Sequence, residues 1–228
     1  MMLPIAFASF VTVFTALFPV INPLGDGPIF LNMVQGCSKE VKDKLARSVS
    51  INCFFLLLAS MLFGTQLLMF FGISLPALKL AGGAVVIGMG WSLLNQKSSG
   101  KSDDESAGIT DANAASSAFF PLTLPLTTGP GSIATAISLV AGYQDGKTLN
   151  LIKELPTVIG AVLALMFLSI IIYLIYRESS LIQRALGPAG TNAVMRLFAF
   201  ILLAIGVQIF LGGVQGFSVE LLSALPAH

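Results

Sequence analysis

Two stretches of similar sequence decide the fold of this chain. Phe18–Phe30 reads FPVINPLGDGPIF, and Phe120–Ser132 reads FPLTLPLTTGPGS. One offset of 102 positions superposes them without a gap, and six of the first eleven positions are identical, four of them proline or glycine. An internal repeat of this kind predicts two halves of similar structure.

The sequence around the repeats is typical of a membrane protein. Only 10% of the 228 residues are charged and 55% are hydrophobic, whereas a soluble domain has about 25% charge. The uncharged stretches can each cross a bilayer, which takes roughly 20 apolar residues in a helix: they are 1–25, 48–78, 80–96, 112–144, 155–176 and 197–219. We therefore predict an all-α polytopic membrane protein with six transmembrane helices. A soluble enzyme, a nucleic-acid binder (net charge +1) and an outer-membrane barrel are excluded.

The six predicted spans divide into two sets of three. Residues 1–95 form the first three-helix repeat, 96–117 a disordered cytoplasmic linker rich in Ser, Gly, Asp and Ala, and 118–228 the second repeat. Because three is odd, the second copy enters the membrane from the opposite side. The prediction is thus an inverted-topology repeat with an in-plane pseudo-two-fold axis.

Basic residues indicate the orientation of the spans. Nine lysines and arginines fall on one side of the six spans and three on the other, and the richer side is cytoplasmic. We expect a multi-pass protein of the inner (plasma) membrane with both termini external or periplasmic.

The prolines of each motif must interrupt the first helix of each repeat. Proline lacks an N–H and clashes with the preceding turn. We expect unwound segments at membrane depth, made possible by glycine, and half-helices that restart at Pro28 and Pro130. Unwound backbone in a membrane has to be buried or to line a hydrated cavity. The alternative is that the prolines only shape the helix bundle.

Two such breaks facing each other predict a binding site for a small solute. The N-terminus of a half-helix suits a carboxylate, and unwound carbonyls suit an ammonium group, so an amino acid zwitterion fits both. The threonines and Asn22 could equally satisfy the broken backbone. The candidate substrate-binding residues are Asn22, Pro23, Gly25, Gly27, Pro28, Thr123, Thr127, Thr128, Gly129, Pro130, Gly131 and Ser132.

Asp26 is the one carboxylate inside a predicted span or its break. An intramembrane acid is a functional hypothesis by default, and here the hypothesis is coupling to a proton or another cation. The alternative is a loop acid close to water that favours the start of the next half-helix.

Other functional classes have less support in the residues. An enzyme would need a nucleophile with a base, yet the only histidine is His228 and no second carboxylate joins Asp26. No metal site and no cofactor motif are recognisable. The leading prediction is a secondary transporter, and the alternative is a channel or an exporter for another small solute. The expected partners are the lipid bilayer and the solute, with no nucleic acid; the oligomeric state stays open.

The chain resembles the MarC family of bacterial and archaeal inner-membrane proteins, which is related to the LysE exporter superfamily. The similarity rests on NPLGDGP at 22–28, PLTLPLTTGPGSIA at 121–134, FGIS at 71–74 followed by KLAGG at 79–83, and RLFAFILLAIGVQIFLGGV at 196–214. It implies a six-span inverted-repeat fold and transport of small neutral amino acids such as glycine and alanine. The family motif Asn-Pro-x-Gly-x-x-Pro maps onto Asn22, Pro23, Gly25 and Pro28, and Gly-Pro-Gly maps onto Gly129–Gly131. Asp26 falls on a position that the motif leaves unspecified.

Overall fold

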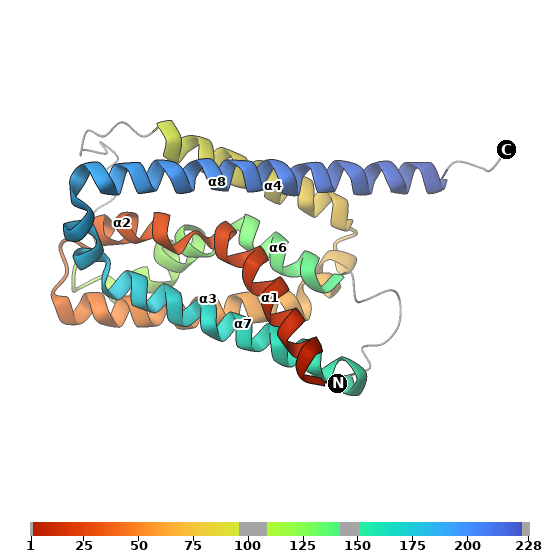
Figure 1. Ribbon diagram of the computed structural model, residues 1–228, viewed down its shortest axis with the longest axis horizontal. Coiled ribbons are helices and arrows are strands. Elements are labelled where there is room, and N and C mark those ends of the chain that lie inside the picture. The colour runs from red at the N-terminus through yellow and green to blue at the C-terminus, as the bar shows by residue number, and fades with distance from the viewer. Residues whose placement is uncertain (1, 96–108, 142–150, 225–228) are drawn as a thin grey trace.

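The computed structural model describes residues 2–95, 109–141 and 151–224, and all regular secondary structure in these ranges is helical (Figure 1). The all-α prediction is therefore confirmed. The elements are α1 (Met2–Ile21), α2 (Pro23–Met33), α3 (Lys39–Phe70), α4 (Leu75–Asn95), α5 (Ala114–Ser117), η1 (Ala118–Thr127), α6 (Pro130–Ala141), α7 (Leu151–Arg177) and α8 (Ser179–Ala224).

Five of the described helices are long and apolar enough to cross a membrane by themselves: α1, α3, α4, α7 and the part of α8 from Ala189 to Val219. A sixth span results when Ala114–Thr127 and Pro130–Ala141 are taken together as one broken span, bent by 69°. Rows of large apolar side chains, including Phe55, Phe70 and Phe200, are exposed on the outside of the bundle. The outer surface is thus suited to lipid.

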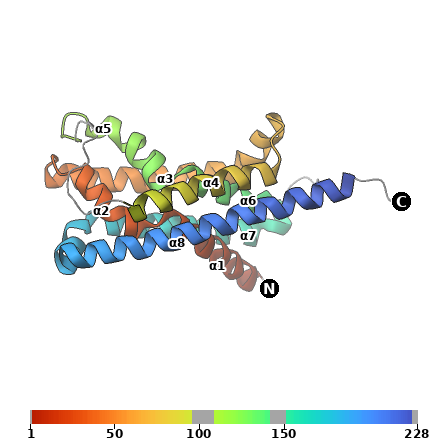
Figure 2. The same cartoon turned by 90° about the horizontal axis from the view of Figure 1, so that it is seen from above.

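The helices run between two ends of an elongated bundle. α1 begins and α8 ends at one of them, while α3 begins and α7 ends at the other (Figures 1 and 2). We name the second the basic end, because most of the described lysines and arginines lie there: Lys39, Lys42, Lys44, Arg47, Arg177 and Arg184. α8 turns at Gly187, whose φ of 64° is left-handed and favours glycine, before it runs back along the bundle.

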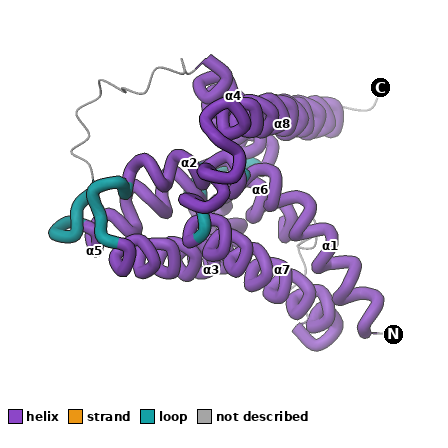
Figure 3. The backbone as a smooth tube through the Cα atoms, turned by 60° about the vertical axis from the view of Figure 1, so that its left-hand side comes forward, coloured by secondary structure: helices purple, strands orange, loops and turns teal. Residues whose placement is uncertain are grey.

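The helices pack as two groups with the broken segments between them. α4 lies along α8, and α7 contacts both α1 and α3 (Figure 3). Close approach of α4 and α8 depends on glycine, since a Cβ on Gly83 would lie 2.6 Å from the Phe210 nitrogen and one on Gly206 would lie 2.7 Å from the Ile87 nitrogen. The second group contains α1, α3 and α7. The larger cluster of buried apolar side chains lies within it, and Leu17, Phe30 and Leu57 of this cluster are almost fully buried.

The first break occurs at a single residue. Asn22 has φ 51° and ψ 52°, ends α1 and caps α2, which begins at Pro23. The predicted restart at Pro28 is wrong, because Pro28 lies inside α2, as do Gly25 and Gly27. Asn22 tolerates the left-handed conformation and brings its own capping oxygen, so the helix restarts at Pro23, five residues before the expected Pro28.

The second break is spread over more of the chain. Phe120 (φ −124°, ψ 121°) and Leu124 (φ −112°, ψ 127°) are extended within η1, each directly before a proline. The ring of a proline disfavours helical backbone at the preceding residue, which explains both positions. α6 begins at Pro130, where the sequence placed the restart.

The predicted linker is only partly described, because residues 96–108 lie outside the described ranges. From residue 109 onward the chain is ordered, contrary to the expectation for this stretch. Ile109 is 4% exposed, its N–H donates to the Met33 carbonyl at 3.2 Å, and its carbonyl accepts from the Cys37 thiol. Asp111 accepts a hydrogen bond from the Ser38 N–H at 2.9 Å. This stretch is thereby fixed to the turn between α2 and α3.

Candidate functional site

The two helix breaks line one small cavity of about 20 Å³. Residues from both motifs contribute, together with apolar side chains of α4 and α8. The lining consists of Val20, Ile21, Asn22, Asp26, Val86, Met89, Leu93, Leu126, Thr127, Gly129, Gly131, Ser132 and Leu202. The expectation that the breaks face each other agrees with this arrangement.

The structure brings only some of the candidate residues to the cavity. Asn22 and Asp26 reach it from the first motif, and Thr127, Gly129, Gly131 and Ser132 reach it from the second. The other candidates do not line it: Pro23, Gly25, Gly27, Pro28, Thr123, Thr128 and Pro130. Their assignment to a substrate site stays a prediction, and several of them have structural roles described below.

Asn22 forms the first wall. Its side-chain oxygen accepts a hydrogen bond from the Gly25 N–H at 3.3 Å, and its backbone carbonyl accepts from the Asp26 N–H at 3.0 Å. A Cβ on Gly25 would collide with the Asn22 amide, so glycine is needed there for the cap to form. The Asn22 amide nitrogen is buried and has no hydrogen-bond partner among the described residues. A buried donor without a partner is costly, which marks it as a group available to a ligand or water.

Asp26 lies in the first turn of α2 and is only 6% exposed. The alternative that Asp26 is a loop acid close to water is therefore wrong. Asp26 does lie at the start of a helix, where a negative charge is favoured. Within the described ranges its carboxylate accepts no hydrogen bond and forms no ion pair. An acid in this setting retains its full capacity to bind a proton or a cationic group.

The start of α6 forms the opposite wall. Ser132 is 2% exposed, and its hydroxyl makes no hydrogen bond with any described residue, nor does the Gly131 N–H. Gly131 also faces α4, because a Cβ there would collide with a Val86 methyl group and lie 3.6 Å from the Gly82 carbonyl. This wall thus offers two donors, and its glycine permits close packing of α6 on α4.

Three residues outside the motifs hold the second break in place. The hydroxyls of Thr127 and Tyr176 are 2.8 Å apart, and the Tyr176 ring stacks on Phe30 of α2 with centroids 4.4 Å apart. The Thr128 hydroxyl donates to the Cys53 sulfur at 3.0 Å. Asn52 of α3 donates to the Thr123 hydroxyl at 3.3 Å, so it is an interhelical hydrogen-bond partner. Tyr176 and Cys53 were missed, because no pattern marks a tyrosine or cysteine in an apolar helix as a neighbour of a distant motif.

The threonines of η1 also satisfy its broken backbone. Thr123 and Thr127 donate to the carbonyls of Ala118 and Leu122, both at 2.7 Å. Extended residues leave such carbonyls without helical partners. Thr127 therefore both repairs the backbone and lines the cavity.

The described residues contain no group of three or more His, Cys, Asp or Glu side chains placed to hold a metal ion. The polar groups of the cavity are instead one carboxylate, one amide, two hydroxyls and a free N–H. Such a set can bind a small zwitterion through both of its charges.

Comparison with known proteins identifies the relatives of this chain. The model of the MarC family of integral membrane proteins matches residues 7–218. The membrane protein YvbG of Bacillus subtilis is 34% identical over 92% of this chain and 96% of its own length. A membrane protein of Pyrococcus horikoshii is 30% identical over 92% and 96%, and the inner membrane protein MarC of Escherichia coli is 30% identical over 87% and 90%. No solved structure matches significantly. The chain therefore belongs to the MarC family of integral membrane proteins.

Proposed function

We propose that this protein is a secondary transporter of small neutral amino acids of the glycine and alanine type, placed in the inner (plasma) membrane. The observation that carries the proposal is that both broken motifs meet at one cavity. Helix breaks at membrane depth that face each other across a repeat are typical of substrate sites in transporters. The substrate class follows from the polar groups of the cavity and from the resemblance stated above.

The substrate's two charges fit opposite walls. Its ammonium group would lie against the Asp26 carboxylate, and its carboxylate would accept hydrogen bonds from the Gly131 N–H and the Ser132 hydroxyl at the start of α6. The Asn22 amide nitrogen supplies one more donor. Val20, Val86 and Leu202 close the remaining sides, which favours a hydrogen or a methyl group as the side chain.

The cavity size indicates which state of the transport cycle this is. A volume of about 20 Å³ accommodates one water molecule, since a water needs roughly 10–15 Å³ on this measure. An amino acid is larger, so the helices around the site have to separate before it can enter. We interpret the structure as a closed state of the transport cycle.

The arrangement of helices supports an inverted repeat. The segment α1–α2 runs toward the basic end, whereas η1–α6 runs away from it (Figure 1). The third helices of the two halves pack on each other, as do the second helices. Two halves of this kind can exchange conformations around a central site and so expose it to each side in turn. A reporter fused after Gly100 should be cytoplasmic, whereas one fused after Ala227 should be external.

Asp26 is the proposed coupling group, for a proton or another cation. Its carboxylate can take up a proton while the cavity opens to one side and release it on the other. We expect Asp26→Asn, which keeps the volume but can neither titrate nor pair with the ammonium group, to bind glycine more weakly, to retain exchange only at higher glycine concentration, and to lose accumulation driven by a pH gradient in proteoliposomes. Asp43→Asn, a change of the same kind outside the cavity, should accumulate glycine normally. Undiminished accumulation by Asp26→Asn at low glycine concentration would remove Asp26 both from coupling and from the contact with the ammonium group.

Substrate counterflow tests the proposed function itself. Proteoliposomes loaded with unlabelled glycine should take up labelled glycine above equilibrium, because a carrier exchanges one molecule for another. A channel would only equilibrate the label, and an exporter for a different solute would show no counterflow with glycine or alanine. Either result would overturn the proposal in favour of that alternative.

A further inference from the structure

A second hollow lies on the outer surface, away from the closed cavity. It is a groove of about 540 Å³ between α3 and α7. Phe54 and Phe55 of α3 and Met166 and Ile170 of α7 line its apolar part. Phe55 is 60% exposed and Ile170 is 52% exposed, so the groove opens toward the surroundings of the bundle.

The groove has a polar end and an apolar end. Arg47 and Tyr173 line the polar end, and since α3 and α7 run antiparallel, Phe55 and Met166 lie farther from the basic end. From Arg47 to Phe55 the helix rises about 12 Å. The hollow therefore changes from charged to apolar along the direction of the membrane normal.

The polar end coincides with the predicted membrane boundary on both helices. Arg47 directly precedes the uncharged stretch Ser48–Leu78, and Arg177 directly follows the uncharged stretch Leu155–Tyr176. A side chain at this depth meets lipid headgroups on one side and acyl chains on the other. Two helices place the boundary independently at the same end of the groove.

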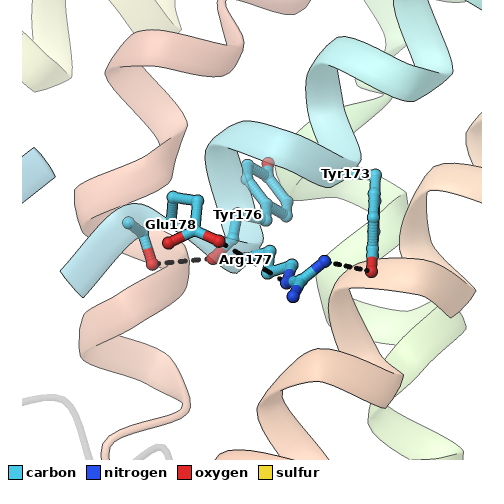
Figure 4. A network of polar contacts seen from close by, with 5 residues as sticks. Tyr173, Tyr176, Arg177 and Glu178 are labelled. Atoms are coloured by element: carbon cyan, nitrogen blue, oxygen red, sulfur yellow. Dashed lines mark hydrogen bonds and ion pairs between the residues drawn. The ribbon is translucent and has the colours of Figure 1, made fainter. Parts of the chain in front are cut away.

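Arg47 is the cation that the groove leaves available. It is exposed and forms no ion pair within the described ranges. Arg177, by contrast, pairs with Glu178 at 3.5 Å and donates to the Tyr173 hydroxyl at 3.3 Å (Figure 4). Basic side chains outnumber acidic ones among the described residues at this end. The acidic residues are Glu40, Asp43, Asp111 and Glu178, and the basic residues are Lys39, Lys42, Lys44, Arg47, Arg177 and Arg184.

We propose that this groove binds one anionic phospholipid, with the phosphate on Arg47 and an acyl chain along the apolar part. A guanidinium matches a phosphate in geometry and charge, and Tyr173 offers an amphipathic ring at headgroup depth. A second copy of the chain fits less well, since it would cover Arg47 with an apolar surface and leave the charge unpaired. The basic surface surrounding the groove also favours an anionic headgroup over a zwitterionic one.

Native mass spectrometry of the delipidated full chain tests the proposal, with phosphatidylglycerol and phosphatidylcholine as probes. We expect phosphatidylglycerol to bind more tightly than phosphatidylcholine. Arg47→Gln should lower the affinity for phosphatidylglycerol about five-fold, which corresponds to ~1 kcal/mol per basic side chain near anionic lipid. Arg184→Gln removes the same charge from an exposed position outside the groove and should bind like the original chain. Ser169→Phe, which fills the groove without changing charge, should weaken both lipids.

Three results would overturn the proposal. Arg47→Gln could keep the full preference for phosphatidylglycerol, or Arg47→Gln and Arg184→Gln could lose it equally, which would indicate a diffuse basic surface rather than a site. Efficient cross-linking of Ile170→Cys between two copies in liposomes would show that a second chain covers the groove. Because these measurements use lipid binding alone, they are independent of the transport assays.

Discussion

The two copies of the proline motif differ in structure although their sequences superpose. Pro19 lies inside α1, whereas the equivalent Pro121 follows the extended residue Phe120. Pro28 lies inside α2, whereas the equivalent Pro130 begins α6. The same prolines thus occur within a helix in one half and at a break in the other.

The position that decides this difference is Asn22 in the first copy and Leu124 in the second. Asparagine tolerates a left-handed backbone and caps the next helix with its own side chain, so the first break needs one residue. Leucine can do neither, and the break spreads over the extended residues Phe120 and Leu124. Thr123 and Thr127 satisfy the nearby carbonyls of Ala118 and Leu122. The first break is held locally, and the second is held by its surroundings.

The largest effect that would sharpen this comparison is expected at Gly131. A leucine there enters the contact between α6 and α4, because even a Cβ collides with Val86. We expect Gly131→Leu to destabilise the protein by about 3 kcal/mol and to abolish glycine uptake, as overpacking of a close helix contact does. Melting in detergent and counterflow in liposomes measure the two effects.

A matched control and a rescue support this prediction. Gly88→Leu, on the face of α4 where a Cβ meets no atom within 4 Å, should melt normally. Gly131→Ala should be milder and should be partly rescued by Val86→Ala, which removes the opposing methyl groups. If Gly131→Leu melts like the original chain, the tight contact between α6 and α4 is disproved.

A smaller effect is expected at Asn22, and it tests whether the first break is held locally. Asn22→Ala loses the cap and places alanine in a left-handed conformation, which together cost about 2 kcal/mol. Asn22→Gly keeps the backbone freedom and loses only the cap, so it should cost a few tenths of a kcal/mol. Melting temperatures of the two variants separate these terms. Equal losses of stability in Asn22→Ala and Asn22→Gly would mean that the left-handed backbone at this position does not contribute to the cost.

The smallest effect is expected at Tyr176, whose hydroxyl holds the second break from outside the motif. Tyr176→Phe keeps the stacking on Phe30 and removes the partner of Thr127, for an expected loss of about 1 kcal/mol. The rate of glycine uptake should fall by more than this small loss of stability explains, because Thr127 lines the cavity. Tyr173→Phe, which loses an exposed hydrogen bond to Arg177, is the control and should leave both unchanged. Unchanged uptake in Tyr176→Phe would show that the second break does not need this support.

Much of the candidate site could be predicted from the motifs, since Asn22, Asp26, Gly129, Gly131 and Ser132 all line the cavity. Prolines and glycines carry local backbone rules, so their presence in an apolar stretch predicts a break without knowledge of the fold. Tyr176 and Val86 could not be predicted in the same way. Their roles depend on which helix faces the motif.

The sequence by itself determined the membrane class, the helical spans and the existence of two breaks, because hydrophobicity and proline sterics act over a few neighbouring residues. Only the tertiary structure decided which proline begins a helix, which motif residues face the cavity and which hold the backbone. The threonine hydroxyls of the second broken segment also find partners on other helices, namely Cys53 of α3 and Tyr176 of α7. Packing of the whole bundle, rather than the motif, therefore fixes the geometry of the site.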